Sequence, residues 1–133
     1  MPFDRRLPVL VVEDEDFTAE VVEALLVGIG FEHVDRAADG LDAWTMMRQR
    51  HYALVVSDYR MAPMNGLMFL QSVREDPDLQ DTRILLLTAA SAPEIRREAE
   101  RLGADAFLLK PFTPKALRAS PEAMVQQRRT WSA

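Results

Sequence analysis

The sequence contains no cysteine, which excludes disulfide bonds, cysteine zinc sites and cysteine nucleophiles. It has only two histidines, too few for a histidine-rich metal site. No apolar run reaches the roughly 18 residues that a membrane-spanning helix needs, and the first residues lack the apolar stretch of a signal peptide. The formal net charge of −5 is unlike that of a nucleic-acid-binding domain. We therefore expect a cytoplasmic protein with no membrane insertion and no nucleic-acid partner.

What the sequence does contain is typical of one globular domain. Its 133 residues are 48% hydrophobic and 28% charged. It shows no internal repeat, no low-complexity segment and no linker. We expect one domain over residues 1–133 with its core in residues 6–119, and no output domain.

Five short runs of residues predict β-strands. Four are almost continuously apolar, as is typical of parallel strands covered on both faces, whereas the second is polar. The runs are residues 7–12, 33–37, 52–56, 83–87 and 106–109.

Helical patterns lie between these runs. In the first, Phe17, Val21 and Leu25 form an apolar stripe with Ala24, and we expect this stripe to face the core. Strand and helix alternate, which predicts an α/β fold: a doubly wound, five-stranded parallel sheet flanked by helices. The signals that begin or end helices are Gly28, Gly30, Asp39-Gly40, Asn65-Gly66, Asp76-Pro77, Pro93, Gly103 and Thr113-Pro114.

Polar side chains follow the predicted strands at their carboxyl ends. In an open α/β sheet these ends meet at one edge, where ligands bind. We therefore expect three carboxylates, one hydroxyl and one ammonium to converge there: Glu13, Asp14, Asp58, Thr88 and Lys110.

This set of groups has a specific chemistry. Clustered carboxylates repel one another, and Mg²⁺, which prefers hard oxygen ligands, would remove that penalty. Asp58 is ionised at neutral pH and can attack phosphorus without a general base. The Lys110 ammonium and the Thr88 hydroxyl can then hold the phosphoryl oxygens. The sequence thus predicts a site that makes and holds an aspartyl phosphate.

Each of these residues also has an ordinary structural interpretation. Asp14 could cap the first helix, Asp58 could be a loop acid, Thr88 a strand-end threonine and Lys110 a surface charge. Their coincidence at the ends of four strands favours the site over four separate structural roles.

The residues around this site match a known family. The chain resembles the receiver domain of two-component response regulators, most closely the single-domain, CheY-like members, over residues 6–119. The matching segments are Val9–Glu15, Val55–Met61, Met64–Gly66, Leu87–Ala90 and Leu109–Phe112.

The resemblance implies a flavodoxin-like sheet with strand order 2-1-3-4-5 and assigns roles at the site. Asp58 is expected to be the phosphoacceptor. Asp14, Asp58 and the backbone carbonyl of Arg60 are expected to bind Mg²⁺ directly, and Glu13 largely through water. Lys110 is expected to be the counter-ion of the phosphate.

The resemblance also implies a switch. Thr88 is expected to move toward the phosphoryl group and Phe107 to turn inward, although Phe107 also suits a plain core position. Pro111 is expected to follow a cis peptide bond. Two further positions are expected to tune the lifetime of the phosphate, Arg60 and Ala90.

Two places depart from the family pattern. Ala62 stands where the family usually has proline, and Pro63 follows it, so the loop after Asp58 can take a different path. Ser120-Pro121 interrupts the expected last helix, which either stops near Ala119 or kinks, leaving residues 120–133 as an irregular helix or tail.

The predicted function is a phosphorylation switch rather than an enzyme. Asp58 would receive its phosphoryl group from a sensor histidine kinase or a histidine phosphotransfer protein, and the domain would signal as a monomer or a phosphorylation-dependent dimer by changed binding to another protein. One alternative is a receiver-like binding module that does not switch. Another is a magnesium-dependent phosphatase of the haloacid dehalogenase type, which needs an aspartate where Arg60 stands.

Overall fold

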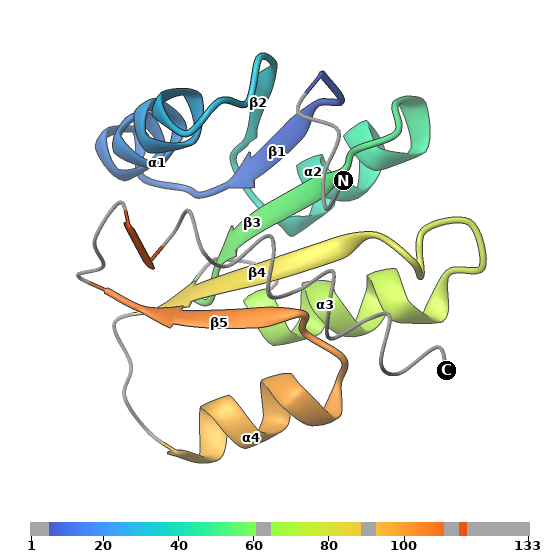
Figure 1. The fold of residues 1–133 in the computed structure, drawn as a ribbon. Helices are drawn as coiled ribbons and strands as arrows, with labels where there is room; N and C mark the ends of the chain where they lie inside the picture. Colours follow the sequence, from blue (N-terminus) through green and yellow to red (C-terminus); the bar gives the residue numbers. More distant parts are fainter. Residues whose placement is uncertain (1–5, 61–64, 89–92, 111–114, 117–133) are drawn as a thin grey trace.

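The computed structural model describes residues 6–60, 65–88, 93–110 and 115–116. Its strands form one five-stranded parallel sheet with the order β2-β1-β3-β4-β5 (Figure 1). The predicted α/β class and strand order are therefore confirmed. None of the described helices is both long and apolar enough to cross a bilayer.

The elements follow the predicted alternation closely. The polar second run is a strand, at the edge of the sheet beside β1. Of the predicted fifth helix, only residues 115–116 are described, and residues 120–133 lie outside the described part. The elements are β1 Val9–Val12, α1 Asp16–Gly28, β2 Val34–Ala37, α2 Gly40–Gln49, β3 Leu54–Asp58, α3 Gly66–Glu75, β4 Arg83–Thr88, α4 Pro93–Arg101 and β5 Ala106–Leu109.

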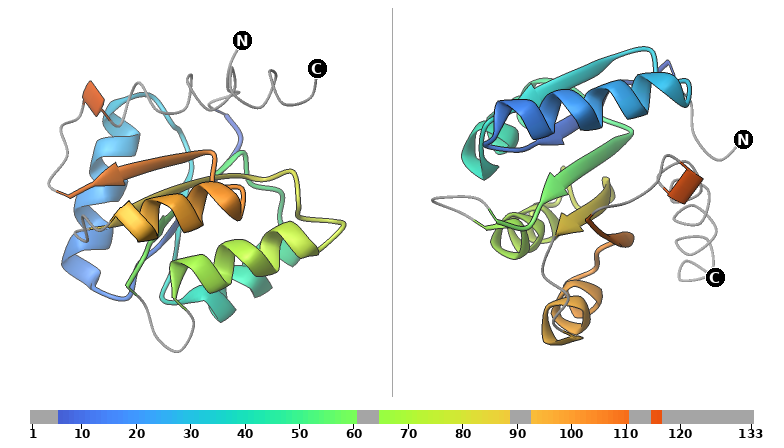
Figure 2. Two further views of the ribbon diagram at one scale, coloured as in Figure 1. Left: turned by 90° about the horizontal axis from the view of Figure 1, so that it is seen from below. Right: turned by 90° about the vertical axis from the view of Figure 1, so that its left-hand side faces the viewer.

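Helices cover both faces of the sheet. α1 packs on one face and α2, α3 and α4 pack on the other (Figure 2). Successive strand residues alternate between these two layers, as the pleat of a strand requires. In β1, Leu10 belongs to the layer under α2 and α3, whereas Val11 belongs to the layer under α1. The three central strands are buried throughout, apart from Arg83 at the start of β4.

The predicted inward stripe of α1 is wrong at Phe17, Val21 and Ala24, whereas Leu25 is half-buried and packs against the core. Phe17 is 72% exposed and Val21 is 42% exposed. The side of the helix that packs on the sheet carries Ala19, Val22 and Leu26 instead. The helix is apolar on more than one side, so its periodicity permits two overlapping stripes and does not choose between them. The outward stripe is consequently an apolar surface.

Candidate functional site

Three polar side chains from distant parts of the sequence meet beyond the carboxyl edge of the sheet. Glu13 directly follows β1, Asp58 is the last residue of β3, and Lys110 directly follows β5. The Lys110 Nζ donates to Asp58 Oδ1 at 2.9 Å and to Glu13 Oε1 at 3.3 Å. The predicted convergence of these three residues therefore occurs in the structure.

Burial strengthens the electrostatic repulsion between the two carboxylates of this site. The side chains of Glu13 and Asp58 are only 6% and 11% exposed. Burial, followed by the negative charge of Asp58, raises the pKa of Glu13 above its ordinary value, although Lys110 acts in the opposite sense. Burial alone would lower the pKa of Lys110, but its hydrogen bond to Asp58 and the charges of both carboxylates raise it instead. One ammonium thus faces two carboxylates, and a negative charge is left in excess.

Thr88 lies at the same edge, as predicted. It is the last residue of β4, it is fully buried, and it pairs in register with Leu109 of β5. Its backbone carbonyl accepts a hydrogen bond from the backbone N–H of Lys110 at 2.8 Å. The backbone thus holds Thr88 and Lys110 next to each other across two adjacent strands.

The oxygen atoms and the charge of the site can be compared with what Mg²⁺ requires of its ligands. Asp14 is exposed, and its carboxyl adjoins Glu13, where it adds to the rise in the Glu13 pKa. In the described part of the chain, no three acidic or histidine side chains are grouped closely enough to surround a metal ion. Mg²⁺ usually keeps several waters and needs only one or two carboxylates. The excess negative charge and hard oxygen atoms of Glu13 and Asp58 fit that ion.

Gly66 allows α3 to begin in close contact with the end of β3, and the sequence did not reveal this role. Its N–H donates to the Tyr59 carbonyl at 2.8 Å, and a Cβ atom on Gly66 would lie 2.7 Å from the Asp58 carbonyl oxygen. α3 can therefore start directly against the end of β3 only with glycine at this position. Asn65 caps the helix by accepting from the Met68 N–H at 2.9 Å. The Asn-Gly pair signalled the cap but not this close approach.

Of the other predicted site residues, some lie in the described part of the chain and others lie outside it. Arg60 is exposed, and Phe107 is half-buried against the core layer beneath α3 and α4. Their roles stay predictions. Four of the positions discussed lie outside the described residues: Ala62, Pro63, Ala90 and Pro111.

Comparison with known proteins agrees with this geometry. The family model described as the response regulator receiver domain matches residues 9–122. A probable chemotaxis protein CheY from Rhizobium etli is 32% identical over 124 residues, covering 93% of this chain and 96% of the relative.

Solved structures show the same likeness. Chemotaxis protein CheY4 of Vibrio cholerae matches with a TM-score of 0.79 and 32% identity, covering 92% of this chain and 98% of the other. A receiver domain of a Pseudomonas aeruginosa sensor histidine kinase, described with a magnesium ion coordinated in its active-site cleft, matches with a TM-score of 0.81 and 25% identity, covering 91% of this chain and 98% of the other.

Proposed function

The chain belongs to the response regulator receiver domain family, and from this premise we propose that Asp58 accepts a phosphoryl group from a sensor histidine kinase or a histidine phosphotransfer protein. The observation that carries the proposal is the 2.9 Å ion pair between Lys110 and Asp58 at a buried site with an excess of negative charge. A carboxylate placed there is largely desolvated and lies beside a cation that can bind the product.

The chemical step uses the Asp58 carboxylate as the nucleophile. A carboxylate oxygen of Asp58 attacks the phosphorus of a phosphohistidine, and the P–O bond forms as the P–N bond breaks. The electron pair of the broken bond stays on the imidazole nitrogen, which takes up a proton. The product is an acyl phosphate on Asp58 and a free histidine on the donor.

The product adds negative charge, which the surrounding groups can compensate. Lys110 already lies within hydrogen-bonding distance of Asp58, so its ammonium can move onto a phosphoryl oxygen with little reorganisation. The Thr88 hydroxyl, on the neighbouring strand, can donate to another phosphoryl oxygen. A magnesium ion held by oxygen atoms of Glu13 and Asp58 together with water would supply further charge neutralisation when bound. Asp14 and the Arg60 carbonyl stay predicted ligands.

The output is proposed to be a change in protein binding near α4. Among the side chains of this helix only Ala99 is fully buried, so α4 is held by a narrow contact. A displacement of Thr88 toward the phosphoryl group would leave space that Phe107, already half-buried, could occupy. Such a change has to bias an existing equilibrium by only a few kcal/mol to be read by a partner.

The exposed stripe of α1 supports an interaction with a protein donor. Phe17 is 72% exposed and Val21 42% exposed on a helix that begins three residues after Glu13. Large exposed apolar side chains next to a reactive group are typical of a docking surface. We expect the phosphodonor to contact these two residues while its phosphohistidine reaches Asp58.

Labelling with acetyl phosphate in the presence of magnesium tests the phosphoacceptor. Wild type should gain one phosphoryl group per chain, Asp58→Asn should gain none, and the matched control Asp78→Asn, at the opposite edge of the sheet, should be labelled like wild type. Label on Asp58→Asn would refute the assignment. Sustained release of phosphate from a phosphate ester would favour the phosphatase, and neither label nor turnover would favour the module that does not switch.

The donor surface needs a separate experiment. Phe17→Ser should slow phosphotransfer from phosphorylated histidine kinases of the same genome about tenfold, because the lost apolar contact weakens docking. Labelling by acetyl phosphate, which does not use this surface, should be unchanged. Equal slowing with both donors would place the defect at Asp58 instead.

A further inference from the structure

A second surface lies on the other side of the sheet, away from α1, between α2 and α3. These two helices run side by side on the same face (Figure 2). Their outer sides carry Leu41 on α2, 55% exposed, and Met68 on α3, 50% exposed. Trp44, one turn beyond Leu41, packs partly against the core and leaves the rest of its ring at the surface. The outer face of this helix pair is thus apolar near the start of both helices.

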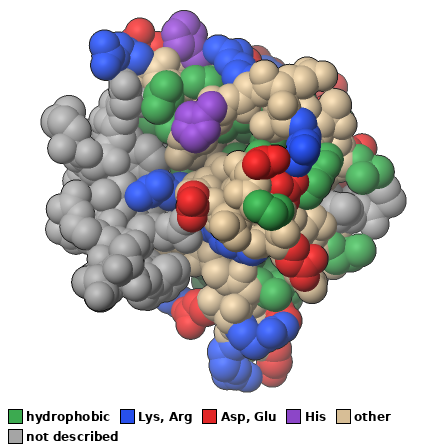
Figure 3. Space-filling model, turned by 90° about the vertical axis from the view of Figure 1, so that its right-hand side faces the viewer, with side chains coloured by type: hydrophobic (Ala, Val, Ile, Leu, Met, Phe, Trp, Pro, Cys, Tyr) green, Lys and Arg blue, Asp and Glu red, His purple; other side chains and the backbone are tan. Residues whose placement is uncertain are grey.

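One helical turn beyond Leu41 and Met68, Trp44 and Ser72 line a hollow of about 510 Å³ that extends to the far ends of the helices. Trp44 forms one wall, and Glu75, Asp76 and Asp78 lie with Arg48 around the remainder. A second hollow, of about 550 Å³, adjoins it through Arg48 and Asp78. The second hollow opens at the amino edge of the sheet, where acidic and basic side chains are intermingled (Figure 3). We call the first hollow and the adjoining Leu41 and Met68 the α2–α3 groove.

The charges in the α2–α3 groove are not balanced. Among the described residues that line it, Arg48 is the one cation, and its guanidinium pairs chiefly with Asp76, at 2.5 Å. Asp78 is 3.7 Å from the other Arg48 nitrogen, with its side chain 79% exposed. Glu75 accepts only a 3.2 Å hydrogen bond from the Gln71 amide among the described residues. Two carboxylates beside an indole ring therefore remain available to a positive group.

We propose that the α2–α3 groove is a docking surface for a basic segment of a partner protein. An arginine or lysine side chain of that segment lies over the Trp44 ring and pairs with Glu75 and Asp78, while apolar neighbours of the base contact Leu41 and Met68. Aromatic rings flanked by carboxylates attract cations by both their quadrupole and their charge. The exposed leucine and methionine favour a protein segment over a free small cation, because a small cation would leave that apolar area uncovered.

The charged part of this surface, around Glu75 and Asp78, is separate from the site at Asp58, whereas Met68 lies two residues after Gly66, which contacts the end of β3. Glu75 is the last residue of α3 and Asp78 follows three residues later, whereas Asp58 lies at the opposite end of the strands. The inference therefore does not depend on phosphorylation, and it survives if Asp58 accepts no phosphate.

A tripeptide titration followed by NMR tests the proposal. Acetyl-leucyl-arginyl-leucinamide is added to the ¹⁵N-labelled full chain, with the indole signal of Trp44 assigned through Trp44→Phe. We expect saturable shifts at Trp44, Glu75 and Met68 with a millimolar dissociation constant. The double variant Glu75→Gln/Asp78→Asn should bind about fivefold more weakly, and Glu94→Gln, an exposed α4 glutamate, should bind like wild type.

Two outcomes would overturn the proposal. The first is equal binding of acetyl-leucyl-glutamyl-leucinamide, since a groove with excess negative charge must reject it. The second is an absence of saturable shifts at Trp44, or shifts centred on Glu13 and Asp58, which would show that the arginine peptide prefers the acidic edge of the sheet.

Discussion

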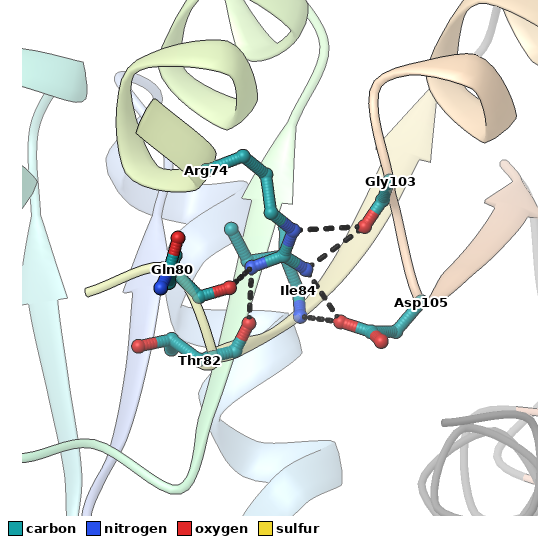
Figure 4. A network of polar contacts seen from close by, with 6 residues as sticks. All are labelled: Arg74, Gln80, Thr82, Ile84, Gly103 and Asp105. Atoms are coloured by element: carbon teal, nitrogen blue, oxygen red, sulfur yellow. Dashed lines mark hydrogen bonds and ion pairs between the residues drawn. The ribbon is translucent and has the colours of Figure 1, made fainter. Parts of the chain in front are cut away.

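Two buried ionic clusters lie at opposite ends of the same sheet, and they differ in how completely their charges are matched. At the amino edge, Arg74 of α3 and Asp105, just before β5, form an ion pair at 2.7 Å (Figure 4). At the carboxyl edge, Lys110 lies between Glu13 and Asp58. Both clusters join distant parts of the chain through a base and a buried carboxylate. Only the second carries more acid than base.

The Arg74 cluster is neutral, and every N–H of its guanidinium is engaged in a hydrogen bond. Its guanidinium donates to the backbone carbonyls of Gly103, Gln80 and Thr82 as well as to Asp105, at distances of 2.7 to 3.0 Å. Asp105 also accepts from the Ile84 N–H at 2.8 Å, and its side chain is completely buried. These bonds tie the end of α3 to the starts of β4 and β5, as Figure 4 shows. Within this arrangement the charge of the base matches the charge of the acid.

The carboxyl-edge cluster stabilises the fold less than the Arg74 cluster does. Its two carboxylates share one flexible ammonium, and their mutual repulsion raises the pKa of Glu13, after the effect of burial. A cation or a protonated group would relieve that repulsion. Similar ionic contacts therefore serve structure where the charges balance and create a binding site where they do not.

The largest effect should come from breaking the balanced cluster. Arg74→Met leaves the Asp105 carboxyl buried and without its base, which should lower the free energy of unfolding by about 3–5 kcal/mol. Urea denaturation measures this loss. The control Arg101→Met removes an exposed arginine paired with Glu98 and should cause no measurable change. A loss no larger than that of the control would mean that the Arg74 cluster is not a structural clamp.

Magnesium should stabilise the protein through the unbalanced cluster. At free magnesium a hundred times the dissociation constant, the free energy of unfolding should rise by about 2.7 kcal/mol if the ion binds only the folded chain. Chelation should reverse the gain, and Asp58→Asn should abolish most of it. An equal gain in Asp58→Asn would place the ion elsewhere. Thermal or urea unfolding with and without magnesium gives the comparison.

Replacing Asp58 with a neutral residue should balance the charges of the carboxyl-edge cluster and make the protein more stable. In magnesium-free buffer, Asp58→Asn leaves one carboxylate, Glu13, with one ammonium, Lys110, and keeps an amide oxygen near the lysine. We expect the free energy of unfolding to rise by about 1 kcal/mol, because removal of a repelling charge at a functional site commonly stabilises a fold. A clear loss of stability in urea denaturation would show that the Lys110–Asp58 bond outweighs the repulsion.

The two clusters also differ in how far the sequence predicted them. Glu13, Asp58 and Lys110 could be placed together because each follows an apolar run, and parallel strands bring those ends to one edge. The Arg74 cluster gave no such signal, since three of its acceptors are backbone carbonyls, at Gly103, Gln80 and Thr82, and any residue type supplies those. Sequence pattern reports side-chain chemistry at strand ends but not which backbone groups lie within reach of a long side chain.

The sequence also did not predict which side of α1 faces the core. The alternation of strands and helices was predicted correctly, because strand and helix periods differ clearly, although β3 runs two residues further than predicted, to Asp58. The inward side of α1 was not, since Val21 and Val22 are adjacent and either could start a buried stripe. Only packing on the sheet, where Ala19, Val22 and Leu26 fit, selects one of them. The same ambiguity leaves Phe17 exposed, where it is available to a partner.

The smallest effect should be a dependence of stability on pH that comes from Glu13 alone. Because the Glu13 pKa is raised in the folded protein, the folded state holds this proton more tightly than the unfolded chain does. The resulting stabilisation is complete below the ordinary pKa of 4.5 and is lost as the pH rises through the raised value. In magnesium-free buffer, wild type should therefore lose stability relative to Glu13→Gln as the pH rises from about 4 to about 7. Urea denaturation across this range measures the difference. A difference that stays constant, or that changes in favour of wild type as the pH rises, would mean that Lys110 fully compensates both carboxylates and that the two clusters are equally balanced.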